Sequence, residues 1–158
     1  HLIMALDDLY REVILDHYSR PRNKGTIDNP DIKVEGANPL CGDELSIHVK
    51  LMQGKVTDVK FVGRGCSISQ ASASMMTEQI KGKTLSEAKA LIGQFKSMMH
   101  GHPASEEELG DLMALQGVRK FPVRIKCATL SWVALEQGVD EFQDSHEKVV
   151  AKASTEVE

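Results

Sequence analysis

Residues 45–63, LSIHVKLMQGKVTDVKFVG, decide how the middle of this 158-residue chain folds. Apolar and polar side chains alternate on both sides of a short glycine-containing stretch, Gln53-Gly54-Lys55. Alternation with a period of two is typical of half-buried β-strands, and a glycine between two such runs is typical of a hairpin turn. The segment therefore predicts a β-hairpin.

The register of the hairpin determines which residues face each other across it. A three-residue loop over 53–55 places Val49 opposite Val59. The next apolar pair toward the open end is then Ile47 with Phe61. These pairs put the apolar side chains of both strands on one face, which is the register that a buried face requires.

Continued to its open end, the same ladder sets Gly42 opposite Cys66. Cys41 and Asp43, which flank Gly42, then lie within about 5 to 7 Å of the position that Cys66 reaches. A regular ladder would point the Cys66 side chain to the opposite face, but glycines near both strand ends allow the backbone to redirect it. We expect two thiols and a carboxylate to converge here.

The residues after Cys66 predict a helix. SISQASASMMTEQIKGK places small and apolar residues at helical spacing, with Ser67 or Ser69 as the expected N-cap and Gly82 just past the end. Cys66 therefore lies at a predicted helix N-terminus, a position that lowers the pKa of a thiol.

Further helices are predicted on both sides of this region. A first helix of roughly 12 residues ends before Pro21, by the spacing of its apolar residues. Thr84 and Glu87 have the spacing of a capping box at the start of another helix. A last long helix begins near Pro122 and carries Cys127 in or just before its first turns.

Composition and charge argue against several classes of protein. The chain has 23 acidic and 19 basic residues and lacks the Lys/Arg blocks of a nucleic-acid binder. No apolar run approaches the roughly 20 residues of a membrane span, and the N-terminal segment is too charged for a signal peptide. Three cysteines, an odd number, indicate free thiols or ligands rather than disulfides. We expect a cytoplasmic protein that binds neither nucleic acid nor membrane.

The length of the chain fits one domain. We predict that residues 1–3 are the remnant of an expression tag and that residues 4–142 form a single domain. An insertion-like stretch lies near 95–117. The tail over 143–158 lacks aromatic residues and a clear apolar stripe, so we expect it to be flexible.

Three thiols and one carboxylate are enough to fill a tetrahedral site for a metal such as zinc. The candidate ligands are Cys41, Asp43, Cys66 and Cys127. The alternative is that the cysteines are small buried apolar residues and the aspartate belongs to a turn, because unpaired cysteines are usually of that kind. The residue pattern alone leaves both interpretations open.

Histidines and basic residues complete the list of candidates. His17 is interpreted as a structural residue and His48 as a surface residue on the polar face of the hairpin. No histidine is predicted beside a cysteine, which disfavours a cysteine-nucleophile enzyme. Arg124 is either a solvated charge or a partner for an anionic sulfur species, or for Asp43 when the site opens, because positive charge favours a thiolate.

Four motifs give the chain a resemblance to a known family. They are DHYSRPRNKG at 16–25, NPLCGDELSI at 38–47, GCSISQASASMM at 65–76 and FPVRIKCATLSW at 121–132. Their order resembles that of the IscU/NifU N-terminal family of iron–sulfur cluster assembly proteins. The resemblance implies an α+β fold in which a three-stranded antiparallel sheet packs against several helices. It also implies that Cys41, Cys66 and Cys127 are the functional cysteines and that Asp43 is their associated carboxylate.

Two departures from the cluster-scaffold members, together with an insertion, favour the SufU branch of this family. Lys126 stands where the scaffold members have a histidine, and FPVRIK at 121–126 stands where they have a Leu-Pro-Pro-Val-Lys motif. The stretch near 95–117 is similar to the insertion of the SufU branch. Membership of that branch implies a zinc ion at the cysteine and aspartate site. It also implies a SufS-type cysteine desulfurase as the partner, which donates persulfide sulfur and is activated in return.

The mechanism expected from this resemblance is that of a sulfur carrier rather than a stand-alone enzyme. Cys41, on a glycine-flanked loop, is the expected persulfide acceptor, and downstream cluster-assembly proteins are the expected receivers of the sulfur. The alternative is a scaffold that holds iron or a [2Fe-2S] cluster with the same four residues.

Overall fold

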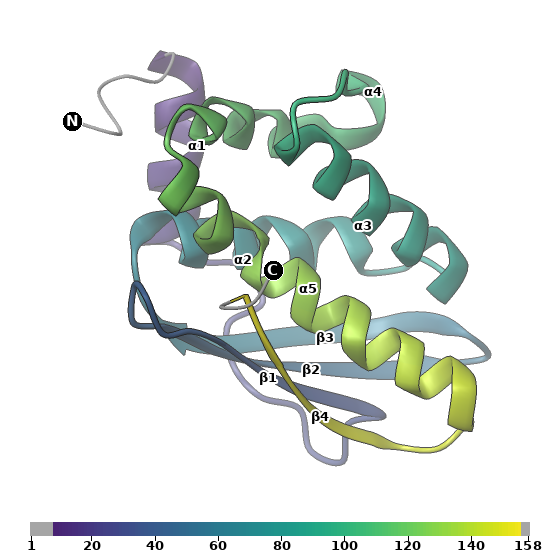
Figure 1. Cartoon of the computed structure of the whole chain (residues 1–158). Helices are drawn as coiled ribbons and strands as arrows, with labels where there is room; N and C mark the ends of the chain where they lie inside the picture. Colours follow the sequence, from purple (N-terminus) through teal and green to yellow (C-terminus); the bar gives the residue numbers. More distant parts are fainter. Residues whose placement is uncertain (1–7, 156–158) are drawn as a thin grey trace.

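A computed structural model describes residues 8–155 of the chain. The elements are α1 (Asp8–Ser19), β1 (Ile32–Asn38), β2 (Asp43–Met52), β3 (Lys55–Arg64), α2 (Ser67–Ile80), α3 (Leu85–Met99), α4 (Glu106–Leu109), the 3-10 helix η2 (Gly110–Lys120), α5 (Pro122–Ser145) and β4 (Val149–Ser154). The strands form one sheet in the order β3-β2-β1-β4, and the helices cover one of its faces (Figure 1). The predicted α+β fold is confirmed.

The hairpin of β2 and β3 has the predicted register. Val49 pairs with Val59 and Ile47 pairs with Phe61, and all four side chains are buried on the face that the helices cover. The apolar alternation of the sequence therefore determined the pairing, as expected for a strand with one buried face.

The turn of this hairpin differs from the prediction of a three-residue loop. Gln53 and Gly54, with φ of 53° and 78°, form a two-residue turn, and Lys55 already belongs to β3. A β-bulge follows, because the register shifts between Lys50 and Leu51. The two turn residues and the one extra residue of the bulge shift the strands by the same amount as a three-residue loop. The predicted register was therefore right although the predicted turn was wrong.

The sheet has a fourth strand, so the prediction of three strands was wrong by one. β1 pairs with β2 in antiparallel fashion, whereas β4 pairs with β1 in parallel, Ile32 lying opposite Val149. The predicted flexible tail over 143–158 is therefore wrong for 149–154. Val149 and Ala151 are buried, and the backbone N–H of Val149 donates to the carbonyl of Asp31 at 2.9 Å.

Two glycines allow α5 to pack closely on β1. A Cβ atom at Gly138 would lie 2.5 Å from Cγ2 of Val34, and a Cβ atom at Gly36 would lie 3.2 Å from Cβ of Ala134. Both distances are below the optimum of about 3.5 to 4.0 Å between carbon atoms, so neither position leaves room for a larger residue. This packing brings the first turns of α5, with Cys127, to the end of β1.

The capping box predicted for the start of α3 is confirmed. Thr84 caps α3, and a full capping box forms because Glu87 and Thr84 each accept a hydrogen bond from the other's backbone N–H. α1 spans 12 residues, and Pro122 is the first residue of α5. The fold thus places both Cys66 and Cys127 near helix N-termini.

The two histidines differ in how well they were predicted. His17 is buried, its Nδ1 lies 2.8 Å from Oγ of Ser74, and burial lowers its pKa. His48 is only 8% exposed, so its assignment to the surface was wrong. The segment before β1 covers the outer face of the sheet there, and the backbone N–H of Ile27 donates to Nδ1 of His48 at 2.9 Å.

The stretch near 95–117 contains the end of α3, all of α4 and most of η2. Leu109, Leu112 and Leu115 are buried, and η2 packs against α1 and α5. Its interpretation as an insertion stays a prediction, and residues 1–3 lie outside the described part of the chain. Within residues 8–155, no helix is long and apolar enough to cross a bilayer.

Candidate metal centre

Cys41 lies in the turn over 39–42 that joins β1 to β2. Its backbone N–H donates to the carbonyl of Asn38 at 3.2 Å, and Gly42 takes a left-handed φ of 71°. Leu40 is 69% exposed, and Cys41 itself is half-buried. The thiol therefore sits on a loop at the surface, as the sequence predicted.

Asp43, the first residue of β2, holds its carboxylate inside the protein at 1% exposure. Oδ1 accepts a hydrogen bond from the backbone N–H of Cys66 at 2.9 Å, and Oδ2 accepts one from Nδ2 of Asn38 at 3.4 Å. Gly65 makes room for this carboxylate, because a Cβ atom there would overlap Oδ1. The backbone at Gly65 also has a φ of 151°, which favours glycine.

Cys66 is itself the N-cap of α2, a position that we had predicted for Ser67 or Ser69. Its Sγ accepts a hydrogen bond from the backbone N–H of Ser69 at 3.5 Å. Sulfur takes the place of the usual hydroxyl or carboxylate oxygen of an N-cap. The thiol is thereby directed along the N-terminus of the helix, where partial positive charge favours a thiolate.

The Cys66 side chain points toward Cys127, a direction that the predicted regular ladder did not give. The ladder between β2 and β3 ends two residues before Cys66, so the predicted pair with Gly42 does not form. A hydrogen bond with the Cys127 thiol lowers the pKa of Cys66 to about 6, and backbone N–H groups of α2 add to this effect. The same bond, together with burial, raises the pKa of Cys127. The two thiols therefore titrate as a coupled pair.

The arrangement of donor atoms fits a single metal ion. One donor atom each of Cys41, Asp43 and Cys127 lies within 4.8 Å of the others. Around a tetrahedral zinc ion, two sulfur ligands are about 3.8 Å apart, because each Zn–S bond is about 2.3 Å long. Cys66 is outside this group but contacts Cys127. The structure thus brings the four predicted ligand residues together, and their binding of a metal stays a prediction.

Arg124 lies in the first turn of α5 and faces the thiols. Its guanidinium donates a hydrogen bond to Cys127, and this bond, with the negative charges of Cys66, Cys127 and Cys41, raises the pKa of Arg124. The interpretation of Arg124 as a partner for anionic sulfur is therefore consistent with its position. Its pairing with Asp43 in an opened site stays a prediction.

Sequence reasoning missed one side chain of the site, Asn38. It is the last residue of β1, it is fully buried, and its Nδ2 lies 3.7 Å from Sγ of Cys127. The burial of β1 alternates, so Ile32, Val34 and Asn38 share the face toward the helices. This alternation was the signal that would have found Asn38, because the same face carries Asp43 on the neighbouring strand.

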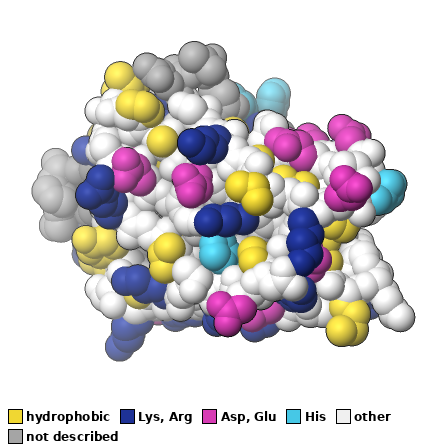
Figure 2. All heavy atoms as spheres, turned by 90° about the horizontal axis from the view of Figure 1, so that it is seen from below, with side chains coloured by type: hydrophobic (Ala, Val, Ile, Leu, Met, Phe, Trp, Pro, Cys, Tyr) yellow, Lys and Arg dark blue, Asp and Glu magenta, His cyan; other side chains and the backbone are white. Residues whose placement is uncertain are grey.

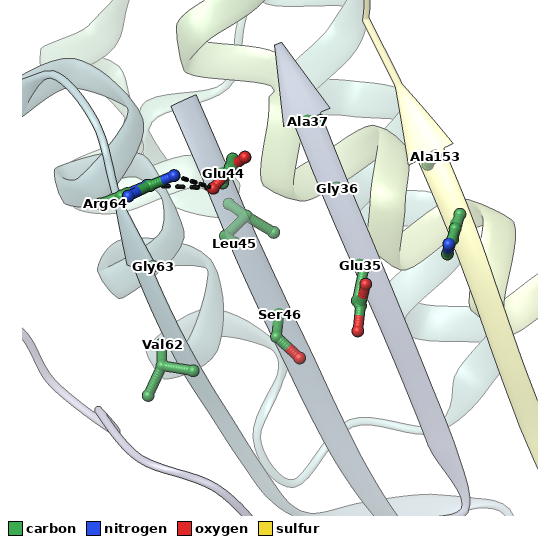
Figure 3. A pocket seen from close by; sticks show the side chains of 11 residues that line it. Glu35, Gly36, Ala37, Glu44, Leu45, Ser46, Val62, Gly63, Arg64 and Ala153 are labelled. Atoms are coloured by element: carbon green, nitrogen blue, oxygen red, sulfur yellow. Dashed lines mark hydrogen bonds and ion pairs between the residues drawn. The ribbon is translucent and has the colours of Figure 1, made fainter. Parts of the chain in front are cut away.

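A hollow of about 580 Å³ lies elsewhere, on the outer face of the sheet. Figure 3 shows Glu44 and Arg64 at one end of it, joined by an ion pair at 2.8 Å. Figure 2 shows basic, acidic and apolar side chains interspersed on this side of the molecule. The described residues that line the hollow include no cysteine, so the thiol chemistry belongs to the opposite face.

The order and position of these residues agree with a known family. The family model of the NifU-like N terminal domain matches residues 9–149 of the chain. The chain belongs to this family. The resemblance drawn from the four motifs is therefore confirmed over residues 9–149 of this NifU-like domain.

Proteins similar to this NifU-like domain include members of two named groups. The zinc-dependent sulfurtransferase SufU of Bacillus subtilis (strain 168) is 56% identical over 135 residues, which cover 85% of this chain and 91% of the relative. The iron–sulfur cluster assembly scaffold protein IscU of Streptococcus pyogenes serotype M1 is 46% identical over 139 residues, covering 87% and 86%. The crystal structure of FiSufU from Fervidobacterium islandicum AW-1 superposes with a TM-score of 0.79 at 37% identity, covering 86% and 97%.

Proposed function

We propose that this NifU-like domain is a zinc-dependent sulfur acceptor, which takes persulfide sulfur from a SufS-type cysteine desulfurase and activates that enzyme. The observation that carries the proposal is the convergence of the Cys41, Asp43 and Cys127 donor atoms within 4.8 Å, with the Cys66 thiol against Cys127. The similarity to a zinc-dependent sulfurtransferase supports this function over others that thiols can perform.

The zinc ligands in this proposal are Cys41, Asp43, Cys66 and Cys127. Three thiolates and a carboxylate suit zinc, which accepts both sulfur and oxygen ligands in a tetrahedral site. When bound, zinc supplies positive charge that keeps its cysteine ligands deprotonated. Asp43 is the harder and weaker ligand of the four, so the site is less inert than one made of thiolates alone.

Cys41 is the thiol that accepts sulfur, because it is the one held by a surface turn. Cys127 is fully buried within α5, and Cys66 is fixed as the N-cap of α2. The Cys41 thiolate attacks the terminal sulfur of a persulfide on the partner's cysteine. A sulfur–sulfur bond forms at Cys41, the partner's sulfur–sulfur bond breaks, and the partner's cysteine leaves as a thiolate. No oxidant or reductant is consumed.

A test of this function measures metal content and sulfur uptake in the wild-type protein. We expect about one zinc per chain after aerobic purification, and a persulfide on Cys41 after mixing with a SufS-type desulfurase and cysteine. Peptide mass spectrometry of alkylated protein locates the added sulfur. Sulfur on none of the three cysteines would refute the proposal.

A [2Fe-2S] scaffold is the second candidate function, since the same four residues suit iron and one similar protein is named as an IscU scaffold. The same preparation separates the two candidates. Stoichiometric iron with a visible absorption band would favour the scaffold, and colourless protein with stoichiometric zinc favours the sulfur acceptor.

The partners follow from this proposal. A persulfide is labile toward other thiols, so the carrier passes its sulfur to downstream cluster-assembly proteins soon after loading. Three unpaired cysteines at one site also require a reducing compartment, which is why we propose a cytoplasmic location.

Replacing Asp43 with alanine should lower both zinc affinity and sulfur transfer by about 10-fold or more, the loss typical of a disturbed metal site. The change removes a ligand oxygen and the acceptor of the Cys66 backbone N–H. Chelator competition and the rate of persulfide formation measure the two effects. Glu44→Ala is the control, because the neighbouring residue points to the opposite face and is exposed. Wild-type transfer by Asp43→Ala would show that the carboxylate has no part in the function.

Replacing Arg124 with alanine should slow persulfide formation on Cys41 about 10-fold while zinc stays bound, because a positive charge near a thiolate favours the anionic sulfur. The guanidinium contacts Cys127 but offers no ligand atom. Single-turnover kinetics with the desulfurase, alongside zinc analysis, provide the measurement. Arg64→Ala removes the same charge from the outer face and should leave the rate unchanged. An unchanged rate in Arg124→Ala would assign that residue to the solvated surface.

A further inference from the structure

Asn38 contacts two residues of the candidate metal centre without being a candidate ligand itself. Its side chain is fully buried at the end of β1. The two hydrogens on Nδ2 are directed to two ligand atoms: Oδ2 of Asp43 at 3.4 Å and Sγ of Cys127 at 3.7 Å. One amide group therefore touches a ligand from β2 and a ligand from α5.

The other half of the Asn38 amide faces a different set of groups. Its Oδ1 is buried without a hydrogen-bond partner in the described part of the chain, and so are the hydroxyls of Ser131 and Thr155. Thr155 follows the pair Ala37–Ser154, so the parallel ladder puts it beside Asn38. Ser131 is one turn after Cys127, on the side of α5 that packs on β1.

The hydroxyls of Ser131 and Thr155 belong to the two elements that flank Asn38, which are α5 and the segment after β4. Buried polar groups that lack a protein partner are usually bound to an internal water, which makes about three hydrogen bonds. The orientation of the amide follows from its other contact, because a carboxylate only accepts hydrogen bonds and the nitrogen must therefore face Asp43.

We propose that Asn38 is the positioning residue of the metal centre. Its Nδ2 group holds Asp43 and Cys127 in the orientation that binds metal. This inference rests on the proposed function in that the metal is zinc. It adds a residue that neither binds the ion nor accepts sulfur.

The physical basis is the cost of holding two groups that become anionic ligands close together. When Cys127 loses its proton to bind metal, its thiolate and the Asp43 carboxylate repel each other, and a shared N–H donor lowers that repulsion. Groups that hydrogen-bond to metal ligands typically change metal affinity by about 10- to 100-fold, and we expect the same range for Asn38.

The test compares zinc and cobalt binding by Asn38→Ala and by Asn38→Leu, which keeps the volume but removes the donor. We expect zinc affinity, measured by chelator competition, to fall about 10- to 100-fold in both. The visible absorption bands of the Co²⁺-loaded variants should shift, because the ligand geometry changes. Glu35→Ala, on the outer face of the same strand, should match the wild type in both measurements.

A merely structural role for Asn38 predicts a different result. The unfolding temperature of the metal-free variants would then fall, while the cobalt spectrum and the zinc affinity of the folded fraction would stay at wild-type values. That result would overturn the proposal. If both variants fail to fold, an NMR measurement on the wild-type protein tests the proposal instead. The Asn38 side-chain amide signals in an NMR spectrum should move and exchange slowly on zinc addition, and unmoved signals would equally overturn it. Wild-type protein that bound no zinc would refute the proposed function instead.

Discussion

Cys41→Ala protein is expected to accept no sulfur from the desulfurase while it still contains zinc. The acceptor thiol lies on the turn over 39–42, where Cys41 is half-buried beside the exposed Leu40. Its removal leaves Asp43, Cys66 and Cys127 as ligands, and a water molecule can complete the tetrahedron. Loss of a nucleophile commonly costs several orders of magnitude, so persulfide formation should fall about 100-fold or more.

The measurement is persulfide labelling of the carrier together with the turnover of the desulfurase. We expect Cys41→Ala to abolish both the label and the activation of the partner enzyme. A variant that retained zinc and still activated the enzyme would identify the domain as a structural zinc module that acts without carrying sulfur. Label on Cys66 or Cys127 of the wild type would assign the acceptor role to a different thiol.

Gly65→Ala is expected to displace the Asp43 carboxylate and to disrupt the site from outside the set of ligands. The added Cβ would overlap Oδ1 of Asp43 and would come within 2.8 Å of Oγ of Ser69. Overpacking of this kind costs about 1 to 3 kcal/mol, to which the strain of alanine in a left-handed backbone adds about 1 kcal/mol. Zinc affinity should fall about 10-fold or more.

Gly82→Ala provides the matched control for this prediction. Gly82 also has a positive φ, of 88°, but a Cβ there meets nothing within 4 Å. The variant should lose about 1 kcal/mol of stability from backbone strain alone and should bind zinc like the wild type. Chemical unfolding and chelator competition, run on both variants, separate the two effects. Equal zinc affinity in Gly65→Ala and Gly82→Ala would mean that the carboxylate tolerates displacement.

The sequence predicted the central hairpin well because its information is local. Val49 and Val59 belong to one alternating pattern, and a slip by one residue would expose every apolar side chain of the strand. The turn was predicted less well. The same pairing register of β2 and β3 results from a three-residue loop or from the two-residue turn at Gln53-Gly54 with a bulge. The apolar pattern of the sequence is the same in both cases.

The candidate site was predicted in its residues and only partly in its geometry. Proximity of Cys41, Asp43 and Cys66 followed from the hairpin register, whereas Cys127 was added by the family resemblance, since no local pattern connects a helix to a strand end that far away. The role of Cys66 as N-cap was missed because serines next to it are better capping residues. Asn38 was missed because a strand end followed by proline reads as the start of a turn.

β4 was not predicted because its signal is weak and its partner is distant in sequence. The strand contains small apolar residues, Ala151 and Ala153, which bury little surface and leave no strong alternation. Its pairing with β1 is parallel and spans more than 100 residues, so no hairpin turn joins the two strands and no turn signal in the sequence indicates the pairing. His48 was misplaced for a related reason, since the cover over its face comes from a loop without regular pattern.

The fourth strand has a consequence for how the protein is made. Cys41, Asp43 and Cys66 leave the ribosome early, Cys127 follows 61 positions after Cys66, and the segment that pairs with β1 comes last. At about 5 to 20 residues per second, the nascent chain carries two thiols and a carboxylate for about 3 to 12 seconds before the third thiol exists. Metal capture by the complete set of donors therefore cannot precede the synthesis of α5, which carries Cys127.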